Sequence, residues 1–413
     1  MTATPQSTVS IDAAAQRLWD VVVIGGGPAG ALAAHQLARR GRSVIVIDKT
    51  TFPRHKVCGG CFNHRSIAAL QACELGELVP ELGGEPIQSL RIMGRQRGVE
   101  VRLRGGYSLS RHAFDAALLS AMIQRGADFL PEVRATLTSL DGDHRVVACQ
   151  QGSRRFEVAG RIILAAHGLA GMAAHWADAE QGKDAVAATG GRSPRSATGA
   201  TIPGSRIGAG IVCHQGGSRL EAGKIYMACG RHGYLGAVRV EGQCIDLAAA
   251  FDPASIQRLG LGEVAAATAR EAGFSQLEGL ESLAWAATPL LTRSPHRIAG
   301  TRIFAVGDAA GYVEPFTGEG IAWALHGALA VAPLADRGVA DWNESLCSQW
   351  TAEHRRLVRR RQWLIRSLAS TMRHPWMTST LITGLRAFPW AASPFTQWLD
   401  TVPRHASGNA WGK

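Results

Sequence analysis

The segment Gly25-Gly26-Gly27-Pro28-Ala29-Gly30 constrains the fold of this chain more than any other feature. It follows Asp20–Ile24, a short apolar and β-branched run that is typical of a buried parallel strand. It precedes Ala31–Arg40, whose composition is helical, and a second apolar run, Arg42–Asp48, which ends in an acidic residue. Together these residues predict one βαβ unit of the dinucleotide-binding type.

Each glycine of this segment has its own physical reason. Gly25 permits a tight turn, Gly27 lets a pyrophosphate approach the backbone, and Gly30 lets the helix pack on the strand. The helix N-terminus attracts the phosphates, and Asp48 is placed to accept hydrogen bonds from ribose hydroxyls. An ordinary glycine turn is the alternative, but it does not explain the strand, the helix and the carboxylate together.

A second segment, Thr301–Ile321 (TRIFAVGDAAGYVEPFTGEGI), also combines a buried strand, a loop and a helix. Asp308 follows the strand, where a carboxylate can bind a polyol chain. Gly318-Glu319-Gly320 begins a helix whose N-terminus would stabilise negative charge on a reduced flavin ring. Alone, the segment fits a capped strand-loop-helix equally well. Two dinucleotide-type motifs far apart in one chain are best explained by one ligand that contacts both.

The pair GGGPAG and GDAAGYVEPFTGEGI resembles the signature of the p-hydroxybenzoate hydroxylase-type flavoproteins. Lys56-Val-Cys-Gly-Gly60 and Thr317–Ile321 resemble the geranylgeranyl reductase branch of that group, and the resemblance extends over most of residues 18 to 335. It implies an α/β fold with a discontinuous Rossmann-like FAD-binding domain, an antiparallel-sheet substrate domain and a C-terminal helical segment. FAD is the expected cofactor.

The resemblance also implies roles for individual residues. Arg111 would contact the cofactor from the start of a helix, and Asp308 would bind the ribityl chain. Cys58 and Glu319 are the candidate catalytic residues, and no metal ligands are expected. The expected cofactor-binding residues are Gly25, Gly27, Pro28, Ala29, Gly30, Asp48, Lys49, Lys56, Cys58, Gly59, Arg111, Val133, Gly168, Gly307, Asp308, Pro315, Gly318, Gly320 and Ile321.

The chain departs from the family pattern in two places. Where the family usually has an Asp-Gly pair tied to pyrophosphate and NAD(P)H handling, this chain has Ala166-His167-Gly168. The aromatic substrate motif of the branch is also absent, and Gly233–Val238 stands in its place. NADPH and a separate electron donor protein therefore both stay open as reductants, and a polyprenyl substrate is not fixed.

The pair Cys58-Gly-Gly-Cys61 has the spacing of a disulfide-exchange motif. The alternative is a tight glycine loop whose thiols pack beside the flavin. A single thiol, Cys58, acting at the flavin face fits better than a dithiol. Zinc would need a second pair with metal-type spacing, which the sequence lacks.

Composition divides the chain into three regions. An FAD-binding domain is expected in residues 18–86, 107–175 and 286–340, a substrate domain in 87–106 and 176–285, and a C-terminal helical region in 341–413. A helix is expected over Ser110–Arg125, with Ser110 as its N-cap. The substrate domain alternates glycine turns with short strands, namely Ile207–Cys213, Lys224–Cys229, Gly233–Val240 and Cys244–Phe251. Apolar residues on these strands would line either a substrate cavity or the sheet core, and they are Ile211, Val212, Leu235, Val238 and Leu247.

The formal net charge of +11 indicates an anionic partner, either nucleic acid, a membrane surface, or a cofactor or substrate. No zinc-finger spacing or RNP-like motif is present, so no nucleic-acid partner is expected. Arginines recur among Trp and Leu in the C-terminal region. Residues 355–390 fit either a peripheral membrane contact or a helix packed on the FAD-binding domain with a solvated arginine face, and the second is commoner. With no signal peptide and no long apolar stretch, a cytoplasmic location is expected, with peripheral membrane contact as the open alternative.

These observations predict an FAD-dependent oxidoreductase that transfers hydride between flavin and a C–C bond of a bulky apolar substrate of isoprenoid, lipid or polyketide-like character. A flavin-dependent monooxygenase that hydroxylates or epoxidises such a substrate is the alternative, because one fold supports both reactions. The halogenase motif Trp-x-Trp-x-Ile-Pro is absent. A flavin-binding module without enzymatic activity is the least favoured interpretation.

Overall fold

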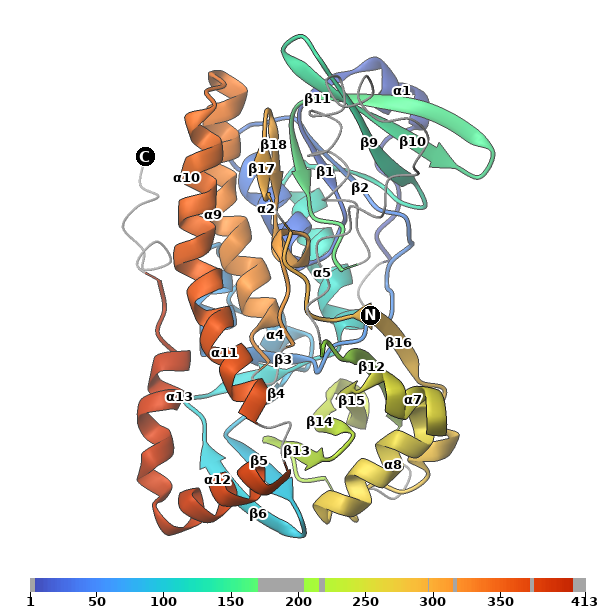
Figure 1. Cartoon of the computed structure of the whole chain (residues 1–413). Helices are drawn as coiled ribbons and strands as arrows, with labels where there is room; N and C mark the ends of the chain where they lie inside the picture. The colour runs from blue at the N-terminus through green and yellow to red at the C-terminus, as the bar shows by residue number, and fades with distance from the viewer. Residues whose placement is uncertain are drawn as a thin grey trace, which may run out of the picture.

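The first half of the molecule is built on an eight-stranded sheet whose central strands are parallel (Figure 1). The computed structural model describes residues 4–169, 204–214, 220–295, 297–314, 318–371 and 375–403. Valine and isoleucine fill the central strands, which are buried on both faces. The main path of the sheet is β17 (Ala299–Gly300), β18 (Ile303–Ala305), β11 (Arg154–Ala165), β1 (Leu18–Ile24), β2 (Val44–Ile47) and β8 (Asp128–Leu130), and β9 (Arg134–Asp141) and β10 (His144–Gln151) extend it from β11.

Helices cover one face of this sheet. Leu32, Leu118 and Leu325 come from three of these helices and belong to one buried cluster with the strand valines. Ser110 accepts a hydrogen bond from the Ala113 N–H, which confirms the predicted N-cap. The helices are α2 (Pro28–Ala38), α5 (Arg111–Gln124), α9 (Gly320–Ala340) and α10 (Ser345–His354), while α1 (Ile11–Gln16) lies by β11 on the other side.

A second, mostly antiparallel sheet of seven strands forms the other half of the described chain. Its order is β16 (Ala286–Leu290), β12 (Ile207–His214), β15 (Cys244–Phe251), β14 (Gly233–Val240), β13 (Lys224–Gly230), β5 (Ser89–Gly94) and β6 (Arg97–Arg102). The helices α7 (Pro253–Leu259) and α8 (Leu261–Ala272) follow β15. The four strands predicted for the substrate domain are therefore confirmed, and the sheet continues through Leu290. Residues 176–203 of the predicted substrate domain lie outside the described residues.

Side chains alternate between the two faces of this sheet. Leu235 and Leu247 belong to the cluster under α8, and Ile211 packs against it, so these residues form the sheet core. Val238 belongs to a separate buried cluster, against which Val212 packs. The interpretation as sheet core therefore holds, and these residues do not mark the substrate cavity.

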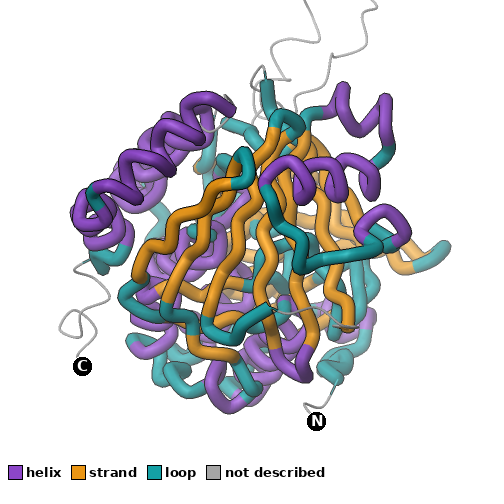
Figure 2. Tube along the Cα trace, turned by 90° about the horizontal axis from the view of Figure 1, so that it is seen from below, coloured by secondary structure: helices purple, strands orange, loops and turns teal. Residues whose placement is uncertain are grey.

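A small sheet and the C-terminal helices complete the molecule. Strands β3 (Cys61–Asn63), β7 (Gly106–Ser108) and β4 (Glu85–Pro86) form the sheet, beside α3 (His64–Gln71) and α4 (Leu78–Glu81). The short 3-10 helices are η1 (Glu241–Gln243), η2 (Leu280–Ser282) and η3 (Gly307–Ala310). After α10 come the π-helical turn η4 (Arg355–Arg359), α11 (Arg360–Thr371), α12 (Pro375–Ala387), η5 (Pro389–Ala392) and α13 (Ser393–Leu399). Seen from below, helices flank the strands (Figure 2). None of the described helices is long and apolar enough to cross a membrane.

Candidate functional site

The predicted dinucleotide turn joins β1 to α2 as the sequence indicated. Gly25 has a φ of +110°, and a Cβ there would lie 2.4 Å from the Ala166 carbonyl oxygen. A Cβ at Gly30 would lie 1.9 Å from the Gly25 carbonyl oxygen. Both positions therefore require glycine because of the protein's own backbone packing.

Gly27 differs from these two glycines. A Cβ there would meet no backbone atom within 4 Å, only the guanidinium groups of Arg54 and Arg111 at 3.3 and 3.9 Å. Gly27 is the N-cap of α2, and Pro28 occupies the first helical position without an N–H to satisfy. The helix N-terminus and two arginines thus form a positive cradle of the size and charge that a pyrophosphate requires.

The acidic residue at the end of β2 fixes this turn. Asp48 Oδ2 accepts from the Gly26 N–H at 2.7 Å, and Oδ1 accepts from the Thr50 N–H at 3.0 Å. The Val133 N–H donates to the Asp48 carbonyl oxygen at 2.9 Å, which brings the expected residue Val133 beside the turn. Lys49 is exposed next to them.

The second motif meets the first directly. Gly307 has a φ of +64°, and a Cβ there would lie 2.8 Å from the Ala29 Cβ of α2. Asp308 follows on η3, and α9 begins at Gly320 with Ile321 buried behind it. The two motifs therefore share one site, as their pairing predicted. Pro315 lies outside the described residues.

Three titratable groups face the space between the motifs. Burial lowers the pKa of Lys56, although Asp308 opposes this effect, and burial raises the pKa of Asp308. Burial, with Lys49 and Lys56 nearby, lowers the pKa of His167 to about 4, so its imidazole is neutral at pH 7. Among the described residues, the buried His167 Nε2 has no hydrogen-bond partner. A Cβ added at Gly168 would lie 3.0 Å from Lys56 Nζ. These groups could hydrogen-bond a polar ligand.

The loop from Lys56 to Cys61 packs against β15 of the second sheet. A Cβ at Gly60, whose φ is +56°, would lie 2.8 Å from Asp246 Oδ2, and one at Gly59 would lie 3.7 Å from the Ala248 Cβ. Gly318 faces the same loop, 3.4 Å from the Cys61 Cβ by the same measure. The loop is thus held between the second sheet and the start of α9.

Asp246 was not expected from the sequence. It is buried, and burial raises its pKa well above the usual range, with Glu241 adding to this effect and Arg111 opposing it. Its neighbours Ile245 and Leu247 point into the core under α8, so alternation along β15 turns Asp246 toward the loop. The signal in the sequence was a single carboxylate inside the apolar run Cys244–Phe251.

Both thiols of the loop are free, and burial raises the pKa of each. Arg111 opposes this effect at Cys58, while Cys61 Sγ donates to the Gly59 carbonyl oxygen at 3.0 Å. Arg111 itself is fixed by a bidentate pair with Asp115 at 2.6 and 2.7 Å. Protonated thiols suit proton donation by Cys58 better than disulfide exchange, which needs a thiolate.

Glu319 was expected to be catalytic, and its contacts favour a structural role. It is fully buried, and its carboxylate accepts from Arg65 at 2.7 Å, Asn63 at 2.8 Å and Trp323 at 3.1 Å. These hydrogen bonds tie α9 to α3 and β3. We therefore propose that Glu319 stabilises the packing of these elements.

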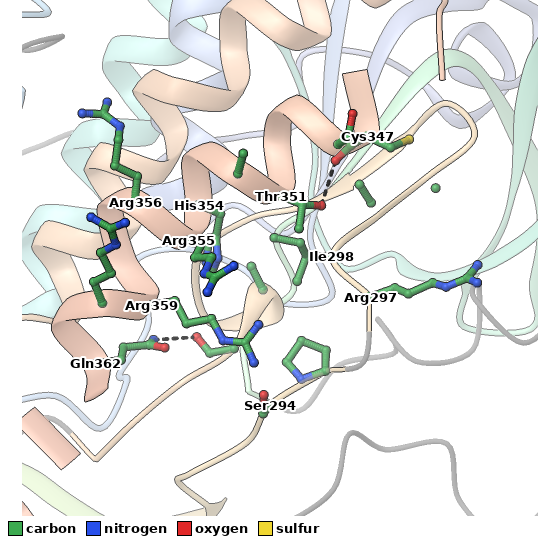
Figure 3. A pocket seen from close by; sticks show the side chains of 18 of the residues that line it. Ser294, Arg297, Ile298, Cys347, Thr351, His354, Arg355, Arg356, Arg359 and Gln362 are labelled. Carbon is green, nitrogen blue, oxygen red and sulfur yellow. Dashed lines mark hydrogen bonds between the residues drawn. The ribbon is translucent and has the colours of Figure 1, made fainter. Parts of the chain in front are cut away.

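A groove of about 1230 Å³ lies outside this site, between the C-terminal helices and the β17–η3 segment (Figure 3). Arg355 and Arg359 reach into it from η4. None of the residues expected to bind the cofactor lines it. Seven arginines do line it, namely Arg293, Arg297, Arg355, Arg356, Arg359, Arg360 and Arg366.

Comparison with known proteins agrees with this geometry. The model of the FAD dependent oxidoreductase family matches residues 20–190. This part of the chain is therefore similar to the FAD-dependent oxidoreductases. It is 26% identical over 364 residues to digeranylgeranylglycerophospholipid reductase 1 of Methanothermobacter thermautotrophicus, which covers 82% of each chain. It is 36% identical over 135 residues to a menaquinone reductase of Mycobacterium tuberculosis, which covers 31% of this chain and 33% of that protein.

Solved structures share the fold of this oxidoreductase. The halogenase PltM in complex with phloroglucinol and FAD superposes with a TM-score of 0.69 at 16% identity, covering 93% of this chain and 86% of that one. The flavin-dependent halogenase CmlS superposes with a TM-score of 0.69 at 19% identity, covering 82% of this chain and 62% of that one. At such identities the likeness concerns the fold alone.

FAD fits the residues present. The open side of Gly27, the two arginines beside it and the unpartnered His167 Nε2 lie where an anionic, hydrogen-bonding ligand would be held. FAD is the cofactor of this family, and the predicted cofactor is confirmed.

Proposed function

We propose that this oxidoreductase reduces carbon–carbon double bonds in an isoprenoid chain attached to a quinone or a glycerophospholipid. Its similarity to a digeranylgeranylglycerophospholipid reductase and to menaquinone reductases supports this substrate class. The alignments with the menaquinone reductases span about a third of those proteins, so the substrate is inferred from the site as well as from the names.

One observation supports reduction above all. The Lys56–Cys61 loop carries Cys58, and β15 places the buried Asp246 against Gly60 of the same loop. Burial raises the pKa of both groups, which favours the protonated form of each. Saturation of a double bond consumes one hydride and one proton, and these groups supply the proton.

Each residue of the site would have its own role in the transfer of the hydride and the proton. FAD bound at this site would supply, once it has been reduced by two electrons, the hydride that adds to one carbon of the double bond. The Cys58 thiol donates its proton to the other carbon, and the former π electrons form the second C–H bond. Arg111 then stabilises the resulting thiolate by charge and hydrogen bonding. Asp246 returns a proton to it and is reprotonated from solvent.

The isoprenoid chain would lie against an apolar face of the second sheet. Met227, Tyr234 and Ala250 on the second sheet form a buried cluster with Leu291, against which Tyr312 of the second motif packs. This face is opposite the core under α8, and α12 covers the part of it near Ile92 and Val99, so the isoprenoid chain would meet the part beside Tyr312. Such a lining suits a chain without charges.

The test uses the FAD-loaded protein, reduced with dithionite under strict anaerobiosis. Menaquinone and a geranylgeranyl glycerophospholipid are supplied separately, and products are analysed by mass spectrometry in H₂O and in D₂O. We expect addition of a pair of hydrogens without oxygen. Cys58→Ser should retain FAD and lose most turnover, whereas Cys347→Ser on α10 should behave like the parent protein.

Oxygenation is the competing outcome. Incorporation of an oxygen atom from isotopically labelled O₂ into the product, together with no anaerobic saturation of either lipid, would overturn the proposal in favour of a monooxygenase. NADPH can be offered to the oxidised protein in the same apparatus. Bleaching of the flavin absorption would identify NADPH as a donor, and its persistence would indicate an electron donor protein.

A further inference from the structure

The C-terminal helices expose an unusual number of large aromatic side chains. Trp390 is 71% exposed, Trp376 is 61% exposed and Phe388 is 57% exposed, and Phe395 on α13 is also exposed. Elsewhere in the described residues outside the C-terminal helices, the exposed large apolar side chains are the single leucines Leu18, Leu140 and Leu259. Exposed aromatic groups gathered on one part of a surface indicate a binding partner.

Trp376 lies on α12, and this helix packs on the second sheet through its other side. Ile382 is fully buried, and Leu381 and Leu385 pack beside it against Ile92 and Val99 of the β5–β6 hairpin. Phe388 and Trp390 contact each other edge to face with ring centroids 6.1 Å apart. Packing on the sheet therefore accounts for one side of α12 and leaves the aromatic side without a described partner.

The surroundings of these aromatics are basic. Residues 354–399 contain eight arginines and no acidic residue. Arg386 is exposed on α12, and Arg97 of the adjoining hairpin donates to Thr383 Oγ1 at 3.5 Å. The hairpin has one acidic residue, Glu100, which pairs with Lys224 at 3.1 Å. The local charge is strongly positive.

We propose that this surface docks the protein on an anionic lipid bilayer. We call it the C-terminal platform and define it by Trp376, Phe388, Trp390, Phe395, Arg97 and Arg386. It lies at one extremity of the molecule, where α12 turns through η5 into α13 (Figure 1). Trp and Phe side chains favour the headgroup region of a bilayer, and arginines beside them are attracted to anionic lipid phosphates. The proposal does not depend on the reaction that the protein catalyses.

The test is flotation of the full FAD-loaded protein with phosphatidylcholine vesicles, with or without phosphatidylglycerol. We expect binding to the anionic vesicles. The Trp376→Gln/Trp390→Gln variant should bind them roughly tenfold more weakly, because two interfacial aromatics are lost. Leu140→Gln removes an exposed apolar side chain from β9, at the opposite end of the molecule (Figure 1). This variant should bind the vesicles as the parent does.

A second pair of variants tests the charge. Arg97→Gln/Arg386→Gln should weaken binding to anionic vesicles by about fivefold for each arginine. Arg154→Gln/Arg155→Gln, at the exposed start of β11, removes the same charge far from the platform and should have little effect. Retained FAD absorption and circular dichroism show that each variant is folded.

Other occupants of the platform predict different results. The proposal would be overturned if the parent protein bound neither kind of vesicle. It would also be overturned if the platform variants bound anionic vesicles as strongly as their control variants. A second copy of the chain as the partner would appear as a dimer in light scattering without lipid, abolished by Trp376→Gln/Trp390→Gln. That outcome would also overturn membrane docking, while leaving the proposed reaction untouched.

Discussion

Substitution of Gly27 by alanine separates ligand contact from protein packing at the dinucleotide turn. An added methyl group would meet only the ends of the Arg54 and Arg111 side chains, at 3.3 and 3.9 Å, and these flexible groups can yield. At Gly30 the same methyl group would lie 1.9 Å from the Gly25 carbonyl oxygen, where the backbone cannot yield. Gly27→Ala should therefore fold, whereas Gly30→Ala should be severely destabilised.

The effect on FAD affinity follows from the orientation of this turn. The methyl group would occupy the place where the pyrophosphate approaches the helix N-terminus. Loss of one hydrogen bond to a charged group costs about 1.5–3 kcal/mol, so FAD should bind roughly tenfold to 150-fold more weakly. The free energy of unfolding of the apo-protein should fall by about 1 kcal/mol or less, as for an N-cap glycine replaced by alanine. Titration of apo-protein with FAD by flavin fluorescence measures the affinity, and urea denaturation measures the stability.

Gly384→Ala on α12 is the matched control, because nothing lies within 4 Å of its added Cβ. It should leave the FAD affinity unchanged and raise the free energy of unfolding by about 1 kcal/mol or less, because alanine favours the helix more than glycine does. Parent-like FAD affinity in Gly27→Ala would refute the argument, since the pyrophosphate would then not approach the backbone at this residue. The assignment of the Gly25–Gly30 turn as the cofactor cradle would have to be abandoned.

Three further predictions concern buried titratable groups. Glu319→Gln leaves the Arg65 guanidinium without its carboxylate and should lower the free energy of unfolding by about 3–5 kcal/mol in urea denaturation; lost turnover at unchanged stability would contradict this. Burial lowers the pKa of His354 to about 4 from 6.5, so the unfolded chain binds the proton first as pH falls through this window. His354 should therefore cost about 3 kcal/mol of stability between pH 6.5 and 4, and denaturation of His354→Gln at both values should show a smaller loss than the parent. Asp246→Asn should keep FAD bound, lower turnover and change the pH dependence of kcat, because burial raises the pKa of Asp246; an unchanged pH profile would contradict its role as a proton source.

The sequence predicted the cofactor cradle well, because local rules determine it. A strand of valines, a glycine turn and a terminal Asp can be arranged in few ways, and the structure places Gly25, Gly30 and Asp48 accordingly. Gly307 and Ala29 lie in contact although they are far apart in the sequence. This contact was nevertheless foreseeable, since both motifs were predicted to bind one ligand.

The sequence could not assign residues whose role depends on long-range packing. Asp246 lies on a strand of the second sheet, and its role becomes visible only when the loop around Gly60 packs against it. Glu319 looked catalytic because it stands inside the flavin motif. Its burial against Arg65 depends on the docking of α3 on α9, which no local pattern encodes.

The proton inventory of the site constrains the reaction that it can support. Burial raises the pKa of Cys58, Asp246 and Asp308 and lowers the pKa of Lys56 and His167. Every one of these shifts favours the uncharged form of its group. Buried groups whose uncharged forms are favoured meet an apolar chain at a lower desolvation cost, and the acids among them can protonate a carbon beside the hydride donor. Such a site has less need of the charged groups that position polar aromatic substrates, which is why we favour reduction of an isoprenoid over oxygenation on this fold.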